Sequence, residues 1–130
     1  MLSKLLCAIS ILATTMAPVA ALDCPSRDLD GILDLLDHAP TCQKSLALFE
    51  ACADGASGDV ALSEVVIRKC EGDFLTRLSE PQHQSYDRRQ KLCSRKYRNE
   101  SGTMYRSFEA FCRANLASDY ARRFARGPRT

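Results

Sequence analysis

Cysteine is the residue type in this chain whose number and spacing could do chemistry. Seven cysteines occur in 130 residues, and Cys7 lies in an apolar N-terminal stretch. The other six are Cys24, Cys42, Cys52, Cys70, Cys93 and Cys112. An even number of cysteines in an exported chain favours a disulfide framework, which needs an oxidising compartment. Buried free thiols are the alternative. No CxxC pair occurs and only two histidines, His38 and His83, are available, so we predict no metal site.

The other polar residues form no recognisable catalytic pattern. The sequence contains no nucleophile elbow, zinc-protease helix, phosphate-binding loop or dinucleotide-binding glycine motif. Glu50, Glu64 and Glu71 come nearest to the carboxylate pair of a glycosidase, but their spacing is that of ordinary acidic residues on helix surfaces. We therefore predict that the protein is not an enzyme and binds no cofactor.

Acidic and basic residues are concentrated in different halves of the chain. Residues 22–66 contain nine acidic residues and two basic ones, whereas residues 67–130 contain fifteen basic residues and seven acidic ones. Either the two halves attract each other within the fold, or one face steers a charged partner. The basic runs within 88–98 are typical of a solvated helix face and lack the interleaved exposed aromatics of a single-strand nucleic-acid platform. We predict no nucleic-acid partner.

Residues 1–21 have the pattern of a secretory signal peptide. Lys4 is followed by an apolar stretch at 5–13, and Val19 and Ala21 place small residues three positions and one position before a cleavage site. We expect cleavage before Leu22, which would leave 22–130 as a single helical domain in the periplasm or secreted. The apolar stretch is too short to span about 30 Å of hydrocarbon, and no later segment is long and apolar enough, so we predict no transmembrane segment.

Apolar residues recur at helical spacing through the rest of the chain. We predict an all-α fold, a small disulfide-stapled bundle of about five helices built from antiparallel helical hairpins. The predicted helices cover about 28–37, 42–53, 60–78, 79–98 and 103–125. The fourth begins with a capping box between Ser79 and Gln82. The apolar faces that we expect in the core include Leu29, Tyr97, Tyr105 and Phe108.

Hairpin geometry favours one of the many pairings that six cysteines allow. In an antiparallel helix pair, residues equally far from the turn lie side by side, so the midpoint of a bonded pair should fall in a loop. Three pairs meet this condition, namely Cys24–Cys52, Cys42–Cys70 and Cys93–Cys112. The rival pair Cys42–Cys52 would have to span about 15 Å on a continuous helix, which is beyond the reach of a disulfide.

The C-terminal half carries a series of residues that suggests a family. The series runs Gln82, Tyr86, Arg89 and Cys93, followed by Gly102-Thr103-Met104 and Cys112. It resembles the lysozyme inhibitor LprI-like family of bacterial envelope proteins, in which a helix with Gln, an aromatic, Arg and Cys precedes a Gly-Ser/Thr-Met turn and a second Cys. Upstream, Cys52, Asp59, Leu62 and Val65 are similar to the family's Cys and Asp-x-x-Leu helix.

The chain also departs from that family's pattern. Ser85 stands where the family has Trp, and Cys24 and Cys70 look like additions. The family's upstream cysteine pair would map to Cys42 and Cys52, which is the pairing that hairpin geometry disfavours.

The resemblance implies an exported, non-enzymatic binding protein whose partner is a lysozyme or another cell-wall hydrolase. Two candidate binding regions follow from the residues. An acidic stripe on the first predicted helix, which would steer a basic lysozyme, consists of Asp30, Asp34 and Asp37. A polar turn that would project as a plug consists of Asn99, Glu100, Ser101, Gly102, Thr103 and Met104. Two alternatives stay open: an envelope or structural protein of unassigned role, and a binder of anionic polymer or membrane surface through the basic C-terminal half, including Arg122, Arg123 and Arg126.

Overall fold

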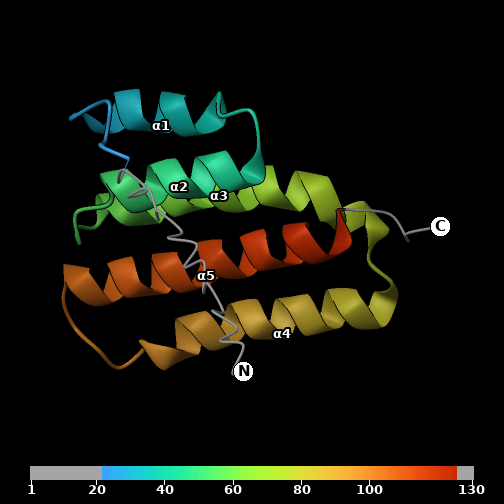
Figure 1. Ribbon diagram of the computed structural model, residues 1–130. Coiled ribbons are helices and arrows are strands. Elements are labelled where there is room, and N and C mark those ends of the chain that lie inside the picture. The colour runs from blue at the N-terminus through green and yellow to red at the C-terminus, as the bar shows by residue number, and fades with distance from the viewer. Residues whose placement is uncertain (1–21, 126–130) are drawn as a thin grey trace, which may run out of the picture.

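The computed structural model describes residues 22–125, and the secondary structure of this part of the chain is entirely helical (Figure 1). The helices are α1 (Leu29–Asp37), α2 (Cys42–Cys52), α3 (Gly58–Phe74), the 3-10 turn η1 (Leu75–Arg77), α4 (Glu80–Lys96) and α5 (Thr103–Phe124). The predicted all-α bundle of five helices is therefore confirmed. The predicted signal peptide at 1–21 lies outside the described residues. Between residues 22 and 125, no helix is both long and apolar enough to cross a membrane.

Local hydrogen bonds explain where several helices begin. The Asp28 side chain accepts a hydrogen bond from the Gly31 N–H at 2.7 Å, and the Thr41 side chain accepts one from the Lys44 N–H at 3.1 Å. The Ser79 N–H donates to Gln82 Oε1 at 2.8 Å, which is the backward half of the expected capping box. Each contact satisfies a polar group that the first turn of a helix or its capping residue leaves without a backbone partner.

The third helix is shorter than predicted. It ends at Phe74 rather than at Leu78, because the chain tightens into η1 before α4 begins. Leu78 is nevertheless buried, as the apolar spacing of the segment predicted. The prediction that the α-helix continues to Leu78 was wrong.

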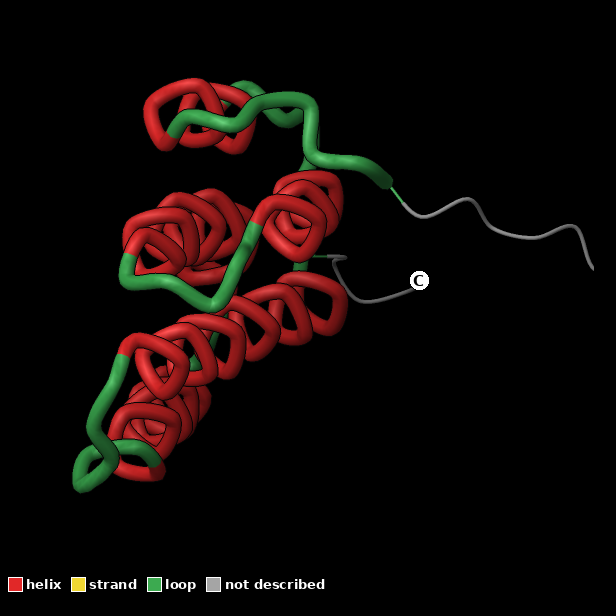
Figure 2. Tube along the Cα trace, turned by 90° about the vertical axis from the view of Figure 1, so that its left-hand side faces the viewer, coloured by secondary structure: helices red, strands yellow, loops and turns green. Residues whose placement is uncertain are grey.

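The chain direction alternates from one helix to the next, and the helices lie in layers (Figures 1 and 2). The most extensive packing is between α3 and α5. On one side of this pair α2 packs against both helices and α1 covers α2 and α3, while α4 packs against α5 on the other side. The bundle therefore has two outer helices, α1 and α4, on opposite sides of a central pair.

Small residues on α5 allow this central packing. Six of them are at most 2% exposed, namely Ser107, Ala110, Ala114, Ala117, Ser118 and Ala121. Apart from the adjacent pair Ala117 and Ser118, successive members are three or four residues apart, so the set forms one stripe along the helix. Short side chains let a neighbouring helix approach closely, and α3 fills the space with larger residues such as Leu62 and Val66, which are buried.

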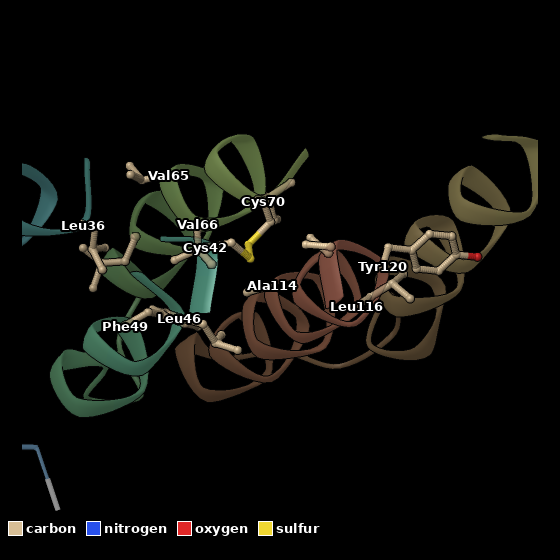
Figure 3. Packing of buried hydrophobic residues seen from close by; sticks show 14 of the residues in the cluster. Leu36, Cys42, Leu46, Phe49, Val65, Val66, Cys70, Ala114, Leu116 and Tyr120 are labelled. Atoms are coloured by element: carbon tan, nitrogen blue, oxygen red, sulfur yellow. A yellow bond between two sulfur atoms is a disulfide. The ribbon is translucent and has the colours of Figure 1, made fainter. Parts of the chain in front are cut away.

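The three predicted disulfides are confirmed. Cys24–Cys52, Cys42–Cys70 and Cys93–Cys112 have Cα–Cα distances of 4.8, 4.7 and 5.7 Å. The first joins the segment before α1 to the end of α2, the second joins α2 to α3, and the third joins α4 to α5. Cys42 and Cys70 are fully buried, and their disulfide lies among the apolar side chains of the core (Figure 3).

An aromatic cluster stabilises the α3–α4 corner, which none of the three disulfides bridges. The rings of Phe74 and Tyr86 are 5.1 Å apart between centroids, and those of Tyr86 and Tyr120 are 4.8 Å apart. The Tyr86 hydroxyl donates to Glu71 Oε1 at 2.8 Å and accepts from Gln90 Nε2 at 2.8 Å. Tyr86 therefore connects α3, α4 and α5 through both its ring and its hydroxyl.

Four apolar residues that we expected in the core are not fully buried. Leu29 is 44% exposed and Phe108 is 43% exposed, while Tyr97 and Tyr105 are half-buried. Leu29 lies in the first turn of α1, where it reaches only as far as the start of α3 near Gly58. Phe108 is on the side of α5 that faces α4. Because α4 ends at Lys96, Tyr97 lies just outside the helix and Phe108 is only partly covered.

We expect reduction of the disulfides to destabilise the protein strongly. The bridges close loops with sequence separations of 28, 28 and 19 residues. Loop entropy predicts about 3–4 kcal/mol for each isolated loop of this size. Thermal unfolding of the oxidised and reduced protein, followed by far-UV circular dichroism, would measure the loss. Peptide mapping without reduction should recover the three pairs, and a Cys42–Cys52 peptide would contradict the structure.

We expect Tyr86 to remain protonated in the folded protein at pH values where exposed tyrosines ionise. Burial raises the pKa of its hydroxyl, and the hydrogen bond to Glu71 raises it further. The unfolded chain releases this proton near pH 10, so the resulting contribution to stability is complete below about pH 10 and decreases as the pH rises above it. Tyrosinate absorbance of the parent and Tyr86→Phe should be equal while both are folded at about pH 10. After denaturation at this pH the parent should gain about half a tyrosinate more than Tyr86→Phe, because an exposed tyrosine is about half ionised there. An excess already present in the folded parent would contradict this expectation.

Candidate functional site

The predicted acidic stripe lies on the outer face of α1. Asp30, Asp34 and Asp37 are all exposed. Asp34 Oδ1 is 3.2 Å from His38 Nδ1, and Asp37 Oδ1 is 3.6 Å from Arg68 Nη2. The hydrogen bond to the Asp34 backbone carbonyl and the charge of its carboxylate raise the pKa of His38. Arg68 offsets one of the three negative charges, and the exposed carboxylates leave the stripe net negative toward solvent.

The structure does not bring the two predicted binding regions together. The stripe is on α1, at the top of Figure 1, whereas the connection between α4 and α5 is at the lower left. The layer of α2 and α3 separates α1 from α5 and α4. The stripe and the turn therefore cannot form one compact docking surface.

The predicted plug is an exposed turn. All six of its residues, 99–104, are exposed, and α5 begins within it at Thr103. Gly102 precedes the helix with φ +113°, a conformation that favours glycine. No side chain caps the start of α5. Its first backbone N–H groups therefore have no side-chain acceptor and are open to an anion.

Met104, the last residue of the predicted turn, belongs to an apolar cluster whose three aromatic members were not predicted as site residues. The ring centroids of Tyr97 and Tyr105 are 6.4 Å apart, and Phe108 is 6.0 Å from each of them. Met104, in the first turn of α5, is 59% exposed. We call Tyr97, Met104, Tyr105 and Phe108 the tip cluster. The three aromatic residues were assigned to the core because their helical spacing matches that of Cys93 and Cys112. The fourth helix was predicted to run to about Arg98 and so to include Tyr97, whereas α4 ends at Lys96.

Charged side chains surround the tip cluster. Arg98, Glu100, Arg106 and Glu109 line a small hollow of about 110 Å³ together with two tyrosines of the cluster. Lys96 Nζ lies 5.2 Å from the centroid of the Tyr97 ring, which places a cation over an aromatic face. Basic groups therefore outnumber acidic ones around the cluster.

Two contacts fix the base of the tip. The Cys93–Cys112 disulfide joins α4 to α5 one helical turn below Tyr97 and Phe108. Ser107 Oγ donates to Asp59 Oδ2 at 2.5 Å, and Asp59 is only 1% exposed. The carboxylate of Asp59 also accepts from the Asp54 N–H at 3.3 Å and the Gly55 N–H at 3.0 Å. The start of α5 is thereby tied to the loop between α2 and α3.

Other sequence-predicted candidates have structural contacts or lie outside the site. Glu64 forms an ion pair with Arg113, and Glu71 accepts from Tyr86. Arg122 pairs with Asp119, while Arg126 lies beyond the described residues. Within residues 22–125, no group of three or more His, Cys, Asp and Glu side chains is placed to hold a metal ion.

Comparison of the chain with models of protein families, with curated proteins and with solved structures found no match. The similarity to the LprI-like family therefore rests on the motif residues alone. Of these, Cys93, Gly102, Met104 and Cys112 lie at the tip or directly below it.

We expect Asp59→Ala to lower the free energy of unfolding by about 2–4 kcal/mol, because it leaves three donors without their acceptor. Urea unfolding followed by circular dichroism would measure the change. Asp54→Ala is the matched control in the same loop, since the Asp54 side chain accepts one exposed hydrogen bond, from the Ala56 N–H. This control should cost no more than about 1 kcal/mol. Equal losses in the two variants would show that the buried carboxylate has no special role.

Proposed function

We propose that this protein is a non-enzymatic binding protein that is exported with a signal peptide cleaved before Leu22 and docks on its partner through the tip cluster. Three disulfides fit an oxidising environment, extracellular or periplasmic. The binding role is supported by the exposure of apolar side chains at the end of a cross-linked hairpin.

The tip cluster is the observation that carries the proposal. Met104 and Phe108 are 59% and 43% exposed, and two half-buried tyrosines and Arg98 adjoin them. Aromatic residues, Met and Arg are enriched in protein interfaces, and exposed groups of large apolar residues are uncommon on monomers without a partner. The disulfide and the Ser107–Asp59 hydrogen bond hold the backbone in place, so docking would cost little conformational entropy.

The chemistry of the tip suits an enzyme with an acidic cleft. Glycoside hydrolases such as lysozymes carry a pair of carboxyl groups that flank the scissile bond. Arg98, Arg106 and the uncapped start of α5 offer complementary groups for carboxylates, next to apolar side chains that would exclude water. The motif resemblance points to the same class of partner, a lysozyme or another cell-wall hydrolase. The acidic stripe on α1 would act at a distance, by raising the rate of encounter with a basic enzyme.

We expect Met104→Ala combined with Phe108→Ala to weaken binding to a susceptible lysozyme by about tenfold or more, mainly through faster dissociation. Both side chains are exposed, so the variant should fold normally. Surface plasmon resonance against a panel of purified lysozymes would measure both rate constants, and inhibition of cell-wall lysis would be the second measurement. Leu29→Ala is the control, because Leu29 is a similarly exposed apolar residue on α1.

Two outcomes would contradict different parts of this proposal. If the parent binds no lysozyme in the panel, the assignment of the partner is wrong. If the parent binds and the tip variant binds equally well, the tip cluster is not the docking surface.

A further inference from the structure

A groove between α4 and α5 lies on the side of the bundle away from α1. Its volume is about 330 Å³, which is at the lower end of the range for small-molecule sites. The lining residues are Arg89, Leu92, Cys93, Lys96, Cys112, Asn115, Leu116 and Asp119. They come from facing sides of two antiparallel helices that the Cys93–Cys112 disulfide joins.

The groove combines an apolar surface with charged groups at its rim. The disulfide and Leu116 provide the apolar part, and both Cys93 and Leu116 are buried. Leu92 adds apolar surface and is 56% exposed, although it lies in a helix rich in charged residues. Leu92 therefore presents apolar surface at the groove that the rest of the protein leaves partly uncovered.

The charged side chains at the rim of the groove that form no ion pair within residues 22–125 are positive. Arg89 and Lys96 are seven residues apart on α4 and therefore lie on the same side of the helix, two turns apart. Arg89 Cζ is 5.8 Å from the centroid of the Tyr120 ring, which restricts its guanidinium. Neither cation forms an ion pair with any described residue, whereas the one acidic lining residue, Asp119, is paired with Arg122. An anionic group would thus be complementary to the rim.

We propose that this groove binds a monomeric, single-chain anionic amphiphile. Its alkyl chain would lie on Leu92, Leu116 and the disulfide, and its phosphate or carboxylate head group would contact Arg89 and Lys96. The apolar surface alone would accept any alkyl chain, and the two cations select the anionic head group. This inference does not depend on the proposed docking of the tip, because no residue of the tip cluster lines the groove, although Lys96 and the Cys93–Cys112 disulfide adjoin both sites.

Decyl phosphate below its critical micelle concentration is the probe, titrated into the purified protein while methyl resonances are followed by NMR. We expect saturable shifts for the methyl groups of Leu92 and Leu116, and none for those of Leu29, an exposed leucine on α1. Inorganic phosphate and decyltrimethylammonium at the same concentrations should cause no saturable shift, because each lacks one of the two recognised groups. Equal shifts at Leu29, or no shift at all, would overturn the proposal.

Two double variants separate specific contacts from general charge. Arg89→Gln with Lys96→Gln should weaken binding by about tenfold or more, since it removes both head-group contacts. Arg88→Gln with Arg95→Gln makes the same charge change at the same spacing on α4; these two residues are exposed, as Arg89 and Lys96 are, but they do not line the groove. We expect this control to change affinity by less than about threefold, because salt screens exposed charges at a distance.

Other results would point to a different ligand and contradict the inference. Equal weakening in the two double variants would indicate diffuse electrostatic attraction. Decyl maltoside binding as tightly as decyl phosphate would show that the head group is not recognised. Binding to anionic vesicles without binding to the monomeric probe would show that α4 meets a membrane surface and that the groove is not a ligand site.

Discussion

The close packing of α5 on α3 determines where every other helix can lie. The stripe of Ala and Ser on α5 leaves room for the branched side chains of α3, and the buried contact of Ser107 with Asp59 fixes one end of this interface. α1 and α2 pack against α3, while α4 packs against α5. Because protein interiors are packed to nearly crystalline density, a larger side chain within the stripe would displace an entire helix rather than a single neighbour.

Disulfides hold the helices together within each of two parts of the bundle, and non-covalent packing joins the two parts. Two overlapping disulfides join the chain from Cys24 to Cys70, and a third joins α4 to α5. Between these two cross-linked parts, the junction consists of the packing of α2 and α3 on α5 together with the polar and aromatic contacts of Tyr86. The hairpin that carries the tip and the groove is therefore braced internally and attached to the rest of the protein by side-chain packing.

The sequence predicted those features that depend on local periodicity. Helical spacing located all five helices, and the midpoint argument found the disulfide pairs because hairpin partners are related by simple symmetry about a turn. Features that depend on distant residues were missed. Asp59 was named only as part of the family motif, and its burial against Ser107, which is 48 residues away, has no local signal in the sequence. Likewise, the exposure of Phe108 depends on how far α4 extends alongside α5. The apolar pattern of α5 alone does not indicate that length.

The pattern of disulfides also determines what happens when a protease cuts the chain. A single cut between Cys24 and Cys70 leaves two fragments that one or both of the overlapping bridges still connect. A cut between Cys93 and Cys112, which includes the exposed turn, likewise leaves the fragments joined. Within the segment between Cys24 and Cys112, only a cut between Cys70 and Cys93 separates the chain into unlinked fragments. The peptide bonds that must stay intact for these two parts to remain covalently joined are thus those between Cys70 and Cys93, which include η1 and the first turns of α4 around the buried ring of Tyr86.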